Sequence, residues 1–312
     1  MAIRDAIAYA SIVGGLLEPR THRVHPLTTE TLVGRSRRAD LCIREDFVSS
    51  VHASLLWQGS GWGLKDLGSR NGTAVNGKVV PPGTRRHLKR GDEITFGQAL
   101  ATWTLDSDAP PRPLARAEGR PVVVGSPGLL ALPDDDEPAL TVFATSVGRW
   151  QLEHGGQSRE IGDHEHIELG GVWWVLRLPS VPAVTRGSQG ARALSLEQSQ
   201  LVLCSGRGKN SSLVSVRADP EAFSFTVGAG ASVLRVLAES RDRSGEGWLE
   251  QSDLLERLSM TDNHLNVAVF RIRRQFADAG FTDATHIVER RNGRLRLGTT
   301  QLRVETRATE GP

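Results

Sequence analysis

The chain has 312 residues, of which 38% are hydrophobic and 24% are charged, and its formal net charge is +2. This length predicts two or three domains of ordinary size, and no stretch is apolar over the length needed to cross a bilayer. The two cysteines, Cys42 and Cys204, are far apart, which excludes a disulfide framework and a four-ligand zinc site built from cysteine. This cysteine usage fits a reducing cytoplasm.

The small net charge hides a strong alternation along the chain. Residues 20–105 hold thirteen Lys or Arg and seven acids, whereas residues 121–178 hold three basic residues and nine acids. Residues 264–303 are basic again, with eight arginines and three acids. Basic ends around an acidic middle suggest two separate anionic ligands.

Two stretches without apolar periodicity predict linkers. Residues 107–120 are rich in proline, and residues 181–194 are rich in small and polar residues. These linkers divide the chain into a first unit at 1–106, a β-rich middle unit at 121–180, a third unit at 195–306 and a tail at 307–312.

Short runs of alternating hydrophobicity, bounded by glycines, fill the first unit. They lie at residues 53–57, 62–66, 74–75 and 93–96. Runs of this length and spacing are typical of an antiparallel all-β sandwich.

Five short segments of the first unit carry a recognisable pattern. They are Gly34-Arg35-Ser36, Ser49-Ser50-Val51-His52, the run from Asp66 to Thr73, Asn76-Gly77 and the run from Gly91 to Gly97. In their order and spacing they resemble the forkhead-associated (FHA) family, although each segment alone is a weak signal. The resemblance implies a domain that binds phosphothreonine peptides.

The candidate phosphate-binding residues also make chemical sense. A phosphate dianion needs a charged donor and several hydroxyl or amide donors that converge from different loops. By the resemblance, Arg35 and Ser49 contact the phosphate oxygens, with help from Ser50 or its amide. Asn71 is expected to hold the peptide main chain, and Arg70 to border the phosphate.

Other polar residues of these segments have a structural interpretation. The family pattern makes His52 a buried donor that fixes the loops, rather than a catalytic or metal-binding residue. The dipeptides Asn71-Gly72 and Asn76-Gly77 are also favourable turn sequences, and for Asn71 only the family order favours a binding role.

The middle unit resembles the end of the first unit. Residues 86–105 align with residues 159–178 at a constant offset of 73, which either marks a degenerate second copy or arises from two unrelated hairpins. The middle unit lacks the other phosphate-binding segments, so packing or dimerisation is expected of it. His164 and His166 provide two ligands, which do not make a closed metal site.

The third unit has helical periodicity. The sequence predicts a strand at 222–227, helices at 232–240 and 252–258, a long helix at 261–277 capped by Thr261, and a hairpin at 287–297 about Asn292-Gly293. Along the long helix, an apolar stripe of Leu265, Val269, Ile272 and Phe276 is expected to face the core, so that the arginines project away from it.

This order of elements resembles the winged helix-turn-helix domain of bacterial response regulators, with the run VAVFRIRRQF placed like their recognition helix. The resemblance implies DNA binding through Arg271, Arg273, Arg274, Arg290, Arg291 and Arg294. An arginine can bridge phosphate oxygens or pair with guanine. Ala268 and Phe270 depart from the family, which places polar groups there, so weak or unusual base readout is expected. In the alternative interpretation, the domain makes protein contacts and its arginines form a solvated face.

No enzymatic motif is present in the sequence. It contains neither a phosphate-binding loop that ends in Gly-Lys-Ser/Thr nor a Gly-x-Ser-x-Gly elbow. We therefore expect a multidomain, cofactor-free regulator that reads phosphothreonine downstream of a bacterial Ser/Thr kinase and binds DNA. The rival is a phospho-dependent adaptor that does not bind DNA. The expected partners are a phosphothreonine-containing protein (the kinase or its substrate), duplex DNA and a second copy of the chain, with no membrane involved.

Overall fold

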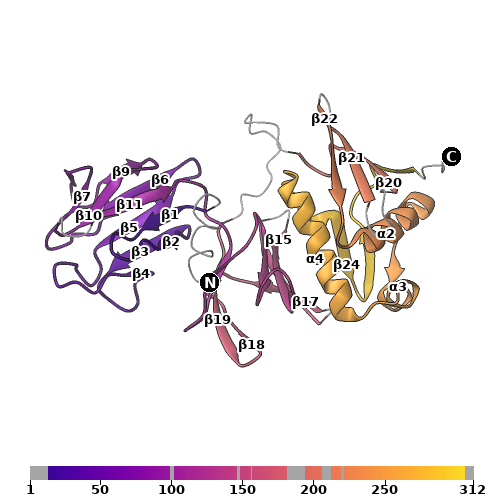
Figure 1. Cartoon of the computed structure of the whole chain (residues 1–312), viewed down its shortest axis with the longest axis horizontal. Helices are drawn as coiled ribbons and strands as arrows, with labels where there is room; N and C mark the ends of the chain where they lie inside the picture. Colours follow the sequence, from indigo (N-terminus) through magenta and orange to yellow (C-terminus); the bar gives the residue numbers. More distant parts are fainter. Residues whose placement is uncertain are drawn as a thin grey trace. The chain divides into compact units, whose positions relative to one another are not determined.

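The structure is a computed structural model that describes residues 13–98, 102–145, 148–155, 157–180, 194–205, 212–218 and 221–305. The chain divides into two compact units (Figure 1). Unit 1 comprises Met1–Leu114 and Arg177–Ser180, and unit 2 comprises Ala115–Leu176 and Val181–Pro312. The expected middle and third units thus share one compact unit. In the part of the chain that the structure describes, none of the helices is both long and apolar enough to pass through a membrane.

Unit 1 is a sandwich of two β-sheets. The first has the strand order β2-β1-β11-β10-β7-β8 and the second has the order β4-β3-β5-β6-β9. Side chains from both sheets, among them Leu55, Trp62, Ile94 and Leu105, form one buried core. This confirms the predicted all-β sandwich. The strands are β1 (Gly15–Leu17), β2 (Val24–Pro26), β3 (Glu30–Gly34), β4 (Leu41–Cys42), β5 (Ala53–Trp57), β6 (Trp62–Asp66), β7 (Thr73–Val75), β8 (Lys78–Val80), β9 (Arg85–Leu88), β10 (Glu93–Phe96) and β11 (Thr102–Ser107).

The residues expected to form the linker at 107–120 are partly structured. Trp62 is fully buried, and its indole Nε1 donates a hydrogen bond to the carbonyl of Ala109 at 3.0 Å. Leu114 is also fully buried and begins strand β12 (Leu114–Arg116). Of the second expected linker, 181–194, the structure describes Leu194, and the tail at 307–312 lies outside the described residues.

The middle strands of unit 2 form two further sheets, with the orders β13-β12-β19-β18 and β14-β15-β16-β17. Their bounds are β13 (Val123–Val124), β14 (Leu129–Leu132), β15 (Leu140–Ala144), β16 (Trp150–His154), β17 (Gln157–Ile161), β18 (His166–Leu169) and β19 (Val172–Arg177). These orders match β2-β1-β11-β10 and β3-β5-β6-β9 of unit 1, strand for strand.

Buried residues recur at matching positions in the two sets of strands. In unit 1, Ile94 of β10 pairs with Trp103 of β11, and Ile167 of β18 pairs with Trp174 of β19 in the same way. All four side chains are buried. The middle strands therefore repeat the strand order of unit 1, which favours a repeat over two unrelated hairpins.

The middle strands lack the two longest connections of the sandwich. In unit 1, residues 35–52 join β3 to β5 and residues 67–84 join β6 to β9, whereas residues 133–139 suffice between β14 and β15. Likewise, β16 ends at His154 and β17 begins at Gln157. The two missing connections carry every residue predicted to bind the phosphopeptide. The middle strands therefore have the strand order of the sandwich but not the loops of that site.

The rest of unit 2 is a mixed α/β region. It contains the sheet β22-β21-β20-β26, the small sheet β23-β25-β24, the helices α2, α3 and α4, and a 3-10 helix at Ala284–Ile287 (Figure 1). Leu265, Val269, Ile272 and Phe276, the predicted apolar stripe of α4, all lie in the core. Thr261 caps α4 by accepting a hydrogen bond from the backbone of His264 at 3.3 Å. The bounds are β20 (Gln200–Ser205), β21 (Ser212–Ala218), β22 (Glu221–Val227), α2 (Ala231–Ser244), β23 (Leu249–Glu250), α3 (Gln251–Leu258), α4 (Asp262–Asp278), β24 (Val288–Arg291), β25 (Arg294–Leu297) and β26 (Leu302–Glu305).

Candidate phosphopeptide site and the arginine helix

Three loops of unit 1 are joined by hydrogen bonds from their backbones and side chains. The amide of Arg35, directly after β3, donates to the carbonyl of Ser49 at 2.9 Å. The amide of Arg70 donates to the Ser49 hydroxyl at 3.0 Å, and the Asn71 side-chain amide donates to the carbonyl of Phe47 at 2.8 Å. The loops that carry the predicted residues are thus held together at one place.

The side chain of Arg35 is held by the neighbouring loop at Nε and is partly exposed to solvent. Its Nε donates to the carbonyl of Val48 at 3.2 Å, and its Nη1 lies 3.7 Å from the carboxylate of Asp46. The side chain of Arg35 is 49% exposed. Its terminal nitrogens are therefore positioned by the neighbouring loop and remain accessible to a ligand from solvent.

Gly34 allows this close approach of the loops. A Cβ at this position would lie 2.2 Å from the carbonyl oxygen of Ser50, a distance that any side chain would have to relieve by moving the backbone. The glycine before Arg35 is thus required by packing, because it lets the amides of Arg35 and Ser36 reach Ser49 and Ser50.

The hydroxyl of Ser49 accepts one hydrogen bond within the domain and can donate another. Because its oxygen accepts the hydrogen bond from the Arg70 amide, its proton is available to an acceptor outside the domain. Ser50 and Arg70 are exposed beside it. The hydroxyl of Ser49 and the cation of Arg35 are a donor set suited to phosphate oxygens.

His52 links the loop that carries Ser49 to the loop that carries Gly72, as predicted. It is fully buried, its Nδ1 accepts from the amide of Ser49 at 3.1 Å, and its Nε2 lies 3.1 Å from the carbonyl of Gly72. A ring that accepts at Nδ1 and donates at Nε2 is neutral. Burial lowers the pKa of His52, and this effect outweighs the opposing influences of the Gly72 carbonyl and Asp66.

Asp66 organises the loop that carries Arg70 and Asn71, and the sequence analysis did not single it out. Its carboxylate accepts from the amides of Gly68 and Ser69 and from the hydroxyls of Ser69 and Thr73, all within 2.9 Å. Burial acts to raise the pKa of Asp66, but these hydrogen bonds lower it overall. The signal in the sequence was an Asp at a strand end, followed by hydroxyl residues three and seven positions later.

Residues 31–97 match the family model described as "FHA domain". This supports an FHA domain in unit 1. The FHA domain-containing protein FhaB of Mycobacterium tuberculosis is 33% identical over 82 residues, which are 26% of this chain and 52% of FhaB. Protein FraH of a Nostoc strain is 40% identical over 53 residues, which are 17% of this chain and 18% of FraH. The chain therefore spans about half of one curated relative and less than a fifth of the other.

The chain is also similar to solved FHA domains. One, from a study of phosphothreonine-dependent FHA domain interactions, is 28% identical, with a TM-score of 0.27, and covers 29% of this chain and 92% of that chain. The FHA domain of FhaA, solved with the intracellular domain of Rv3910, is also 28% identical, with a TM-score of 0.27, and covers 29% of this chain and 97% of that chain.

The predicted DNA-binding arginines form the second candidate site, and two of them are buried. Arg273, on α4, is 2% exposed, and its Nη1 and Nη2 donate to the Glu153 carboxylate of β16 at 2.9 and 3.3 Å. Its guanidinium also lies 4.3 Å from the ring centroid of Phe143. The side chain of Arg290 is 9% exposed and lies 3.9 Å from the same carboxylate. The expectation that Arg273 projects away from the core and that Arg290 is exposed is wrong, because the middle strands cover both.

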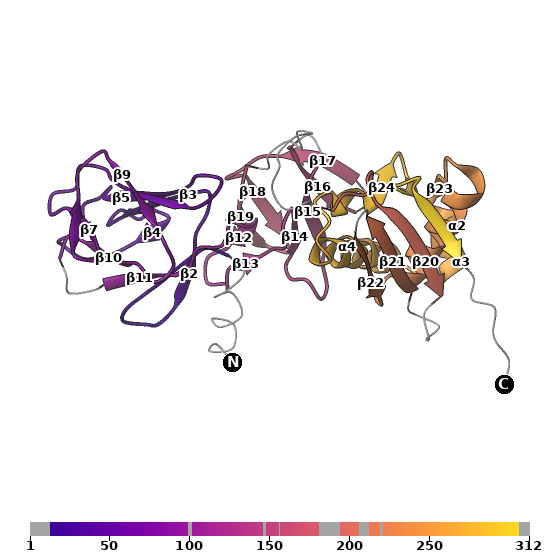
Figure 2. The same cartoon turned by 90° about the horizontal axis from the view of Figure 1, so that it is seen from above.

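Two more of these arginines contact an acidic run between β14 and β15. Arg274 forms an ion pair with Asp135, and Arg271 donates to the carbonyl of Asp136 at 3.1 Å. Phe270 is buried in a cluster with Leu129 and two other residues of the middle strands. Both views show these strands beside α4 (Figures 1 and 2).

The remaining two arginines lie at the turn of the β24–β25 hairpin. Arg291 is exposed. Arg294 is 57% exposed and lies 2.5 Å from Glu250. Asn292 and Gly293 between them both have positive φ, as expected for a two-residue turn. Of the six predicted residues, the structure thus gathers four under the middle strands and leaves two at this turn.

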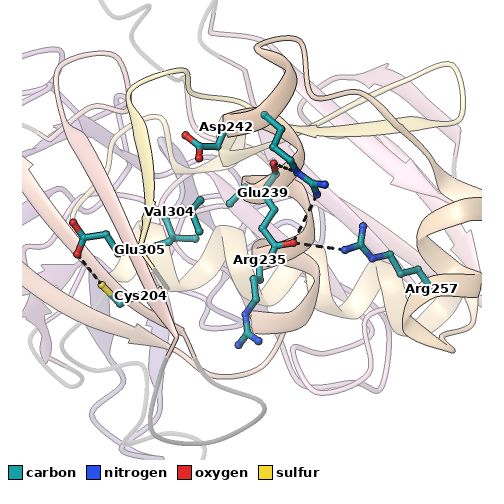
Figure 3. Close-up of a pocket in the computed structure, with 10 residues that line it drawn as sticks. Cys204, Arg235, Glu239, Asp242, Arg257, Val304 and Glu305 are labelled. Atoms are coloured by element: carbon teal, nitrogen blue, oxygen red, sulfur yellow. Dashed lines mark hydrogen bonds and ion pairs between the residues drawn. The ribbon is translucent and has the colours of Figure 1, made fainter. Parts of the chain in front are cut away.

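A cavity of about 410 Å³ in unit 2 lies between α2, α3 and the β20–β26 edge (Figure 3). Its charged lining consists of three arginines and three acids: Arg235, Arg243, Arg257, Glu239, Asp242 and Glu305. Glu239 lies 3.6 Å from Arg257 and 3.9 Å from Arg243. Because the charges balance, the lining favours neither an anionic nor a cationic ligand.

Proposed function

We propose that this chain binds phosphothreonine peptides and acts in signalling. The convergence of Arg35, Ser49 and Asn71 at one end of an FHA-like sandwich carries the proposal. FHA domains bind phosphothreonine in signalling, and residues 31–97 of unit 1 match the FHA model.

The side chains divide the recognition between them. Arg35 provides the charge-assisted hydrogen bonds to the phosphate, and the hydroxyl of Ser49 donates to a second phosphate oxygen. Ser50 and Arg70, exposed beside them, complete the anion site. Because the Asn71 amide nitrogen is engaged by Phe47, its oxygen is left to accept a hydrogen bond from the peptide main chain.

For unit 2 the geometry supports protein contacts better than DNA binding. The observation that favours an adaptor function is that the middle strands (β14–β16) and the acidic run at residues 134–136 lie against α4. We call them the cover over α4. They provide partners within unit 2 for four of the predicted DNA-binding arginines: Arg271, Arg273, Arg274 and Arg290. In this proposal the middle strands are a second, FHA-like copy that has lost its phosphate-binding loops and packs on the helix instead.

DNA binding is the second candidate function of unit 2. It is favoured by the order of α3, α4 and the β24–β25 hairpin, which resembles a winged helix-turn-helix, and by the exposure of Arg291 and Arg294. A transcription regulator downstream of a Ser/Thr kinase would then use the hairpin first, and α4 only after its release from the middle strands.

The phosphopeptide proposal is tested on the whole chain, because unit 1 includes residues 177–180. Fluorescence anisotropy with a degenerate phosphothreonine peptide library is compared with the same library after phosphatase treatment. We expect binding that is lost on dephosphorylation. Equal binding of both libraries would reject the proposal.

A further inference from the structure

Arg177 lies where the chain returns to unit 1. It is the last residue of β19, and its side chain is 8% exposed. Within unit 1 it forms an ion pair with the Asp40 carboxylate, and its Nη2 donates to the Thr28 hydroxyl and to the carbonyl of Glu30, both at 3.0 Å. Arg177 therefore binds both the start of β3 and the residue directly before β4.

Asp40 closes the loop that carries Arg35. This loop spans residues 35–40, between the end of β3 and the start of β4. The Asp40 carboxylate, 20% exposed, also accepts from the backbone amide of Leu32 at 2.9 Å. Asp40 thus ties the end of the loop back to the middle of β3, and Arg177 balances its charge.

The start of the same loop is fixed from the other side. The amides of Arg35 and Ser36 donate to the carbonyls of Ser49 and Ser50 at 2.9 and 3.2 Å. The loop is therefore attached to the next binding loop at its start, and to β3 at its end through the pairing of β4 with β3 and through Asp40, whose carboxylate also pairs with Arg177. Loss of the Arg177–Asp40 ion pair should loosen the end of this segment, which begins with the arginine proposed to meet the phosphate.

We propose that Arg177 is a positioning residue of the phosphopeptide site, which holds the loop at 35–40 in the geometry that presents Arg35. This inference rests on the proposed function of unit 1. Arg177 lies outside residues 31–97, which match the FHA model, and beyond the first unit expected at 1–106. A fragment that ends there keeps all five predicted contact residues but loses the Arg177–Asp40 ion pair, and removal of one partner of a shielded ion pair is costly.

The first test measures phosphopeptide affinity in the full chain. The probe is the tightest-binding phosphothreonine peptide from the library, with its unphosphorylated form as the blank. Arg177→Ala should weaken binding on the order of tenfold, because a loosened loop no longer presents Arg35 for its charge-assisted contact with the phosphate, and Arg177→Lys should recover part of the loss. Arg86→Ala is the matched control, because Arg86 is exposed on β9, at the opposite edge of the sheet that contains β3 and β4. Parental affinity in Arg177→Ala would overturn the inference.

A double-mutant cycle separates positioning from general destabilisation. If Arg177 acts through Arg35, then Arg177→Ala should change affinity less than about twofold in an Arg35→Ala background. Arg177 binds Asp40, Thr28 and Glu30, whereas Arg35 binds Val48 and Asp46, so we expect coupling between the two arginines to pass through the loop. A full tenfold loss in that background would overturn the positioning role.

Hydrogen exchange without peptide distinguishes this inference from the proposed function. Arg177→Ala should speed exchange of the amides at residues 36–40 relative to the parent, while the amides of β5 and β6 stay protected as a check of folding. If the parent ignored phosphopeptides but this loosening occurred, the function would fail and the attachment of the loop would stand. Unchanged exchange at residues 36–40 would overturn the attachment itself.

Discussion

Arg35 is the cation on which the proposed phosphate site depends. Arg35→Ala should cost ~1.5 to 3 kcal/mol of binding free energy, or roughly ten- to a hundredfold in affinity, because charge-assisted hydrogen bonds are lost. Arg35→Lys keeps the charge but loses the Nε contact with Val48, so we expect an intermediate affinity. Titration of the phosphothreonine peptide by fluorescence anisotropy checks both. An alanine variant that bound as well as the parent would remove Arg35 from the site.

His52 makes the stability of unit 1 depend on pH. Because burial lowers its pKa below the ordinary value of 6.5, the unfolded chain binds a proton that the folded unit excludes. The free energy of unfolding therefore falls as the pH drops through about 6.5, and is fully restored above it. In His52→Gln, whose amide can accept from Ser49 and donate to Gly72 without titrating, this dependence should flatten.

Unfolding midpoints measured between about pH 5 and 8 check this expectation. His87→Gln is the matched control, because His87 is exposed on β9, and this variant should keep the slope of the parent. The same slope in the parent and in His52→Gln would show that another group carries the pH dependence.

At the scale of elements, local patterns predicted most of the secondary structure. Alternation placed β5, β6 and β10 at the residues where the structure has them, and Asn76-Gly77 forms its turn with both residues at positive φ. The helical stripe identified the core face of α4. These features depend on neighbours in the sequence, so the sequence contains their signal.

The burial of a second face of α4, which carries Phe270 and Arg273, could not be predicted from local patterns. Arg273 lies off the apolar stripe, and an arginine there is normally solvated. It is buried because Glu153, 120 positions away, supplies a carboxylate inside the same interface. Phe270, which departed from the expected DNA-reading pattern, is buried against the same strands, whereas Ala268 lies in the core of the α/β region. Arg177 was missed likewise, since its partner Asp40 is 137 positions away.

The Glu153 carboxylate should be central to the stability of unit 2. Burial acts to raise its pKa, but Arg273 and Arg290 lower it overall, so the group is held as a carboxylate. Glu153→Gln leaves two buried guanidinium groups without an anion, and should reduce the free energy of unfolding by ~3 to 5 kcal/mol. Scanning calorimetry measures the loss.

The control for this prediction is Glu160→Gln on the neighbouring strand β17. Glu160 pairs with Arg149 at 3.0 Å, but both side chains are more than half exposed, so the same substitution should cost at most ~1 kcal/mol. Equal losses in the two variants would mean that the cover over α4 contributes no more than a surface ion pair.

At the scale of the whole molecule, the repeated strand order was only partly visible in the sequence. The offset of 73 holds between β10 and β18, but it is 99 between β1 and β12 and between β3 and β14. The two shortened connections change the offset twice along the repeat. Between Trp103 of β11 and Trp174 of β19 the offset is 71, so a search at one fixed period detects only part of the repeat.

The acidic run over α4 predicts how the whole chain responds to DNA. With four of the six arginines engaged internally, the parent chain should bind duplex DNA weakly. Each neutralised phosphate contributes ~0.9 to the slope of log affinity against log salt, so Arg291 and Arg294 alone would give a slope of about two in magnitude. Gel shifts and anisotropy with genomic fragments, over a salt series, measure both quantities.

Neutralising that run then separates the two candidate functions of unit 2. Asp134, Asp135 and Asp136 replaced together by Asn should release the Arg274 side chain from Asp135, with the exposed Asp278 as its remaining partner, and steepen the slope by about one if α4 can reach DNA. Asp163→Asn, an exposed acid of the same charge type, is the control and should leave the slope unchanged. A steeper slope in the triple variant would favour the DNA-binding regulator. An unchanged slope in a folded triple variant, with no shift at low salt in the parent, would leave the adaptor, because the arginines of α4 would then serve the interior of unit 2 alone.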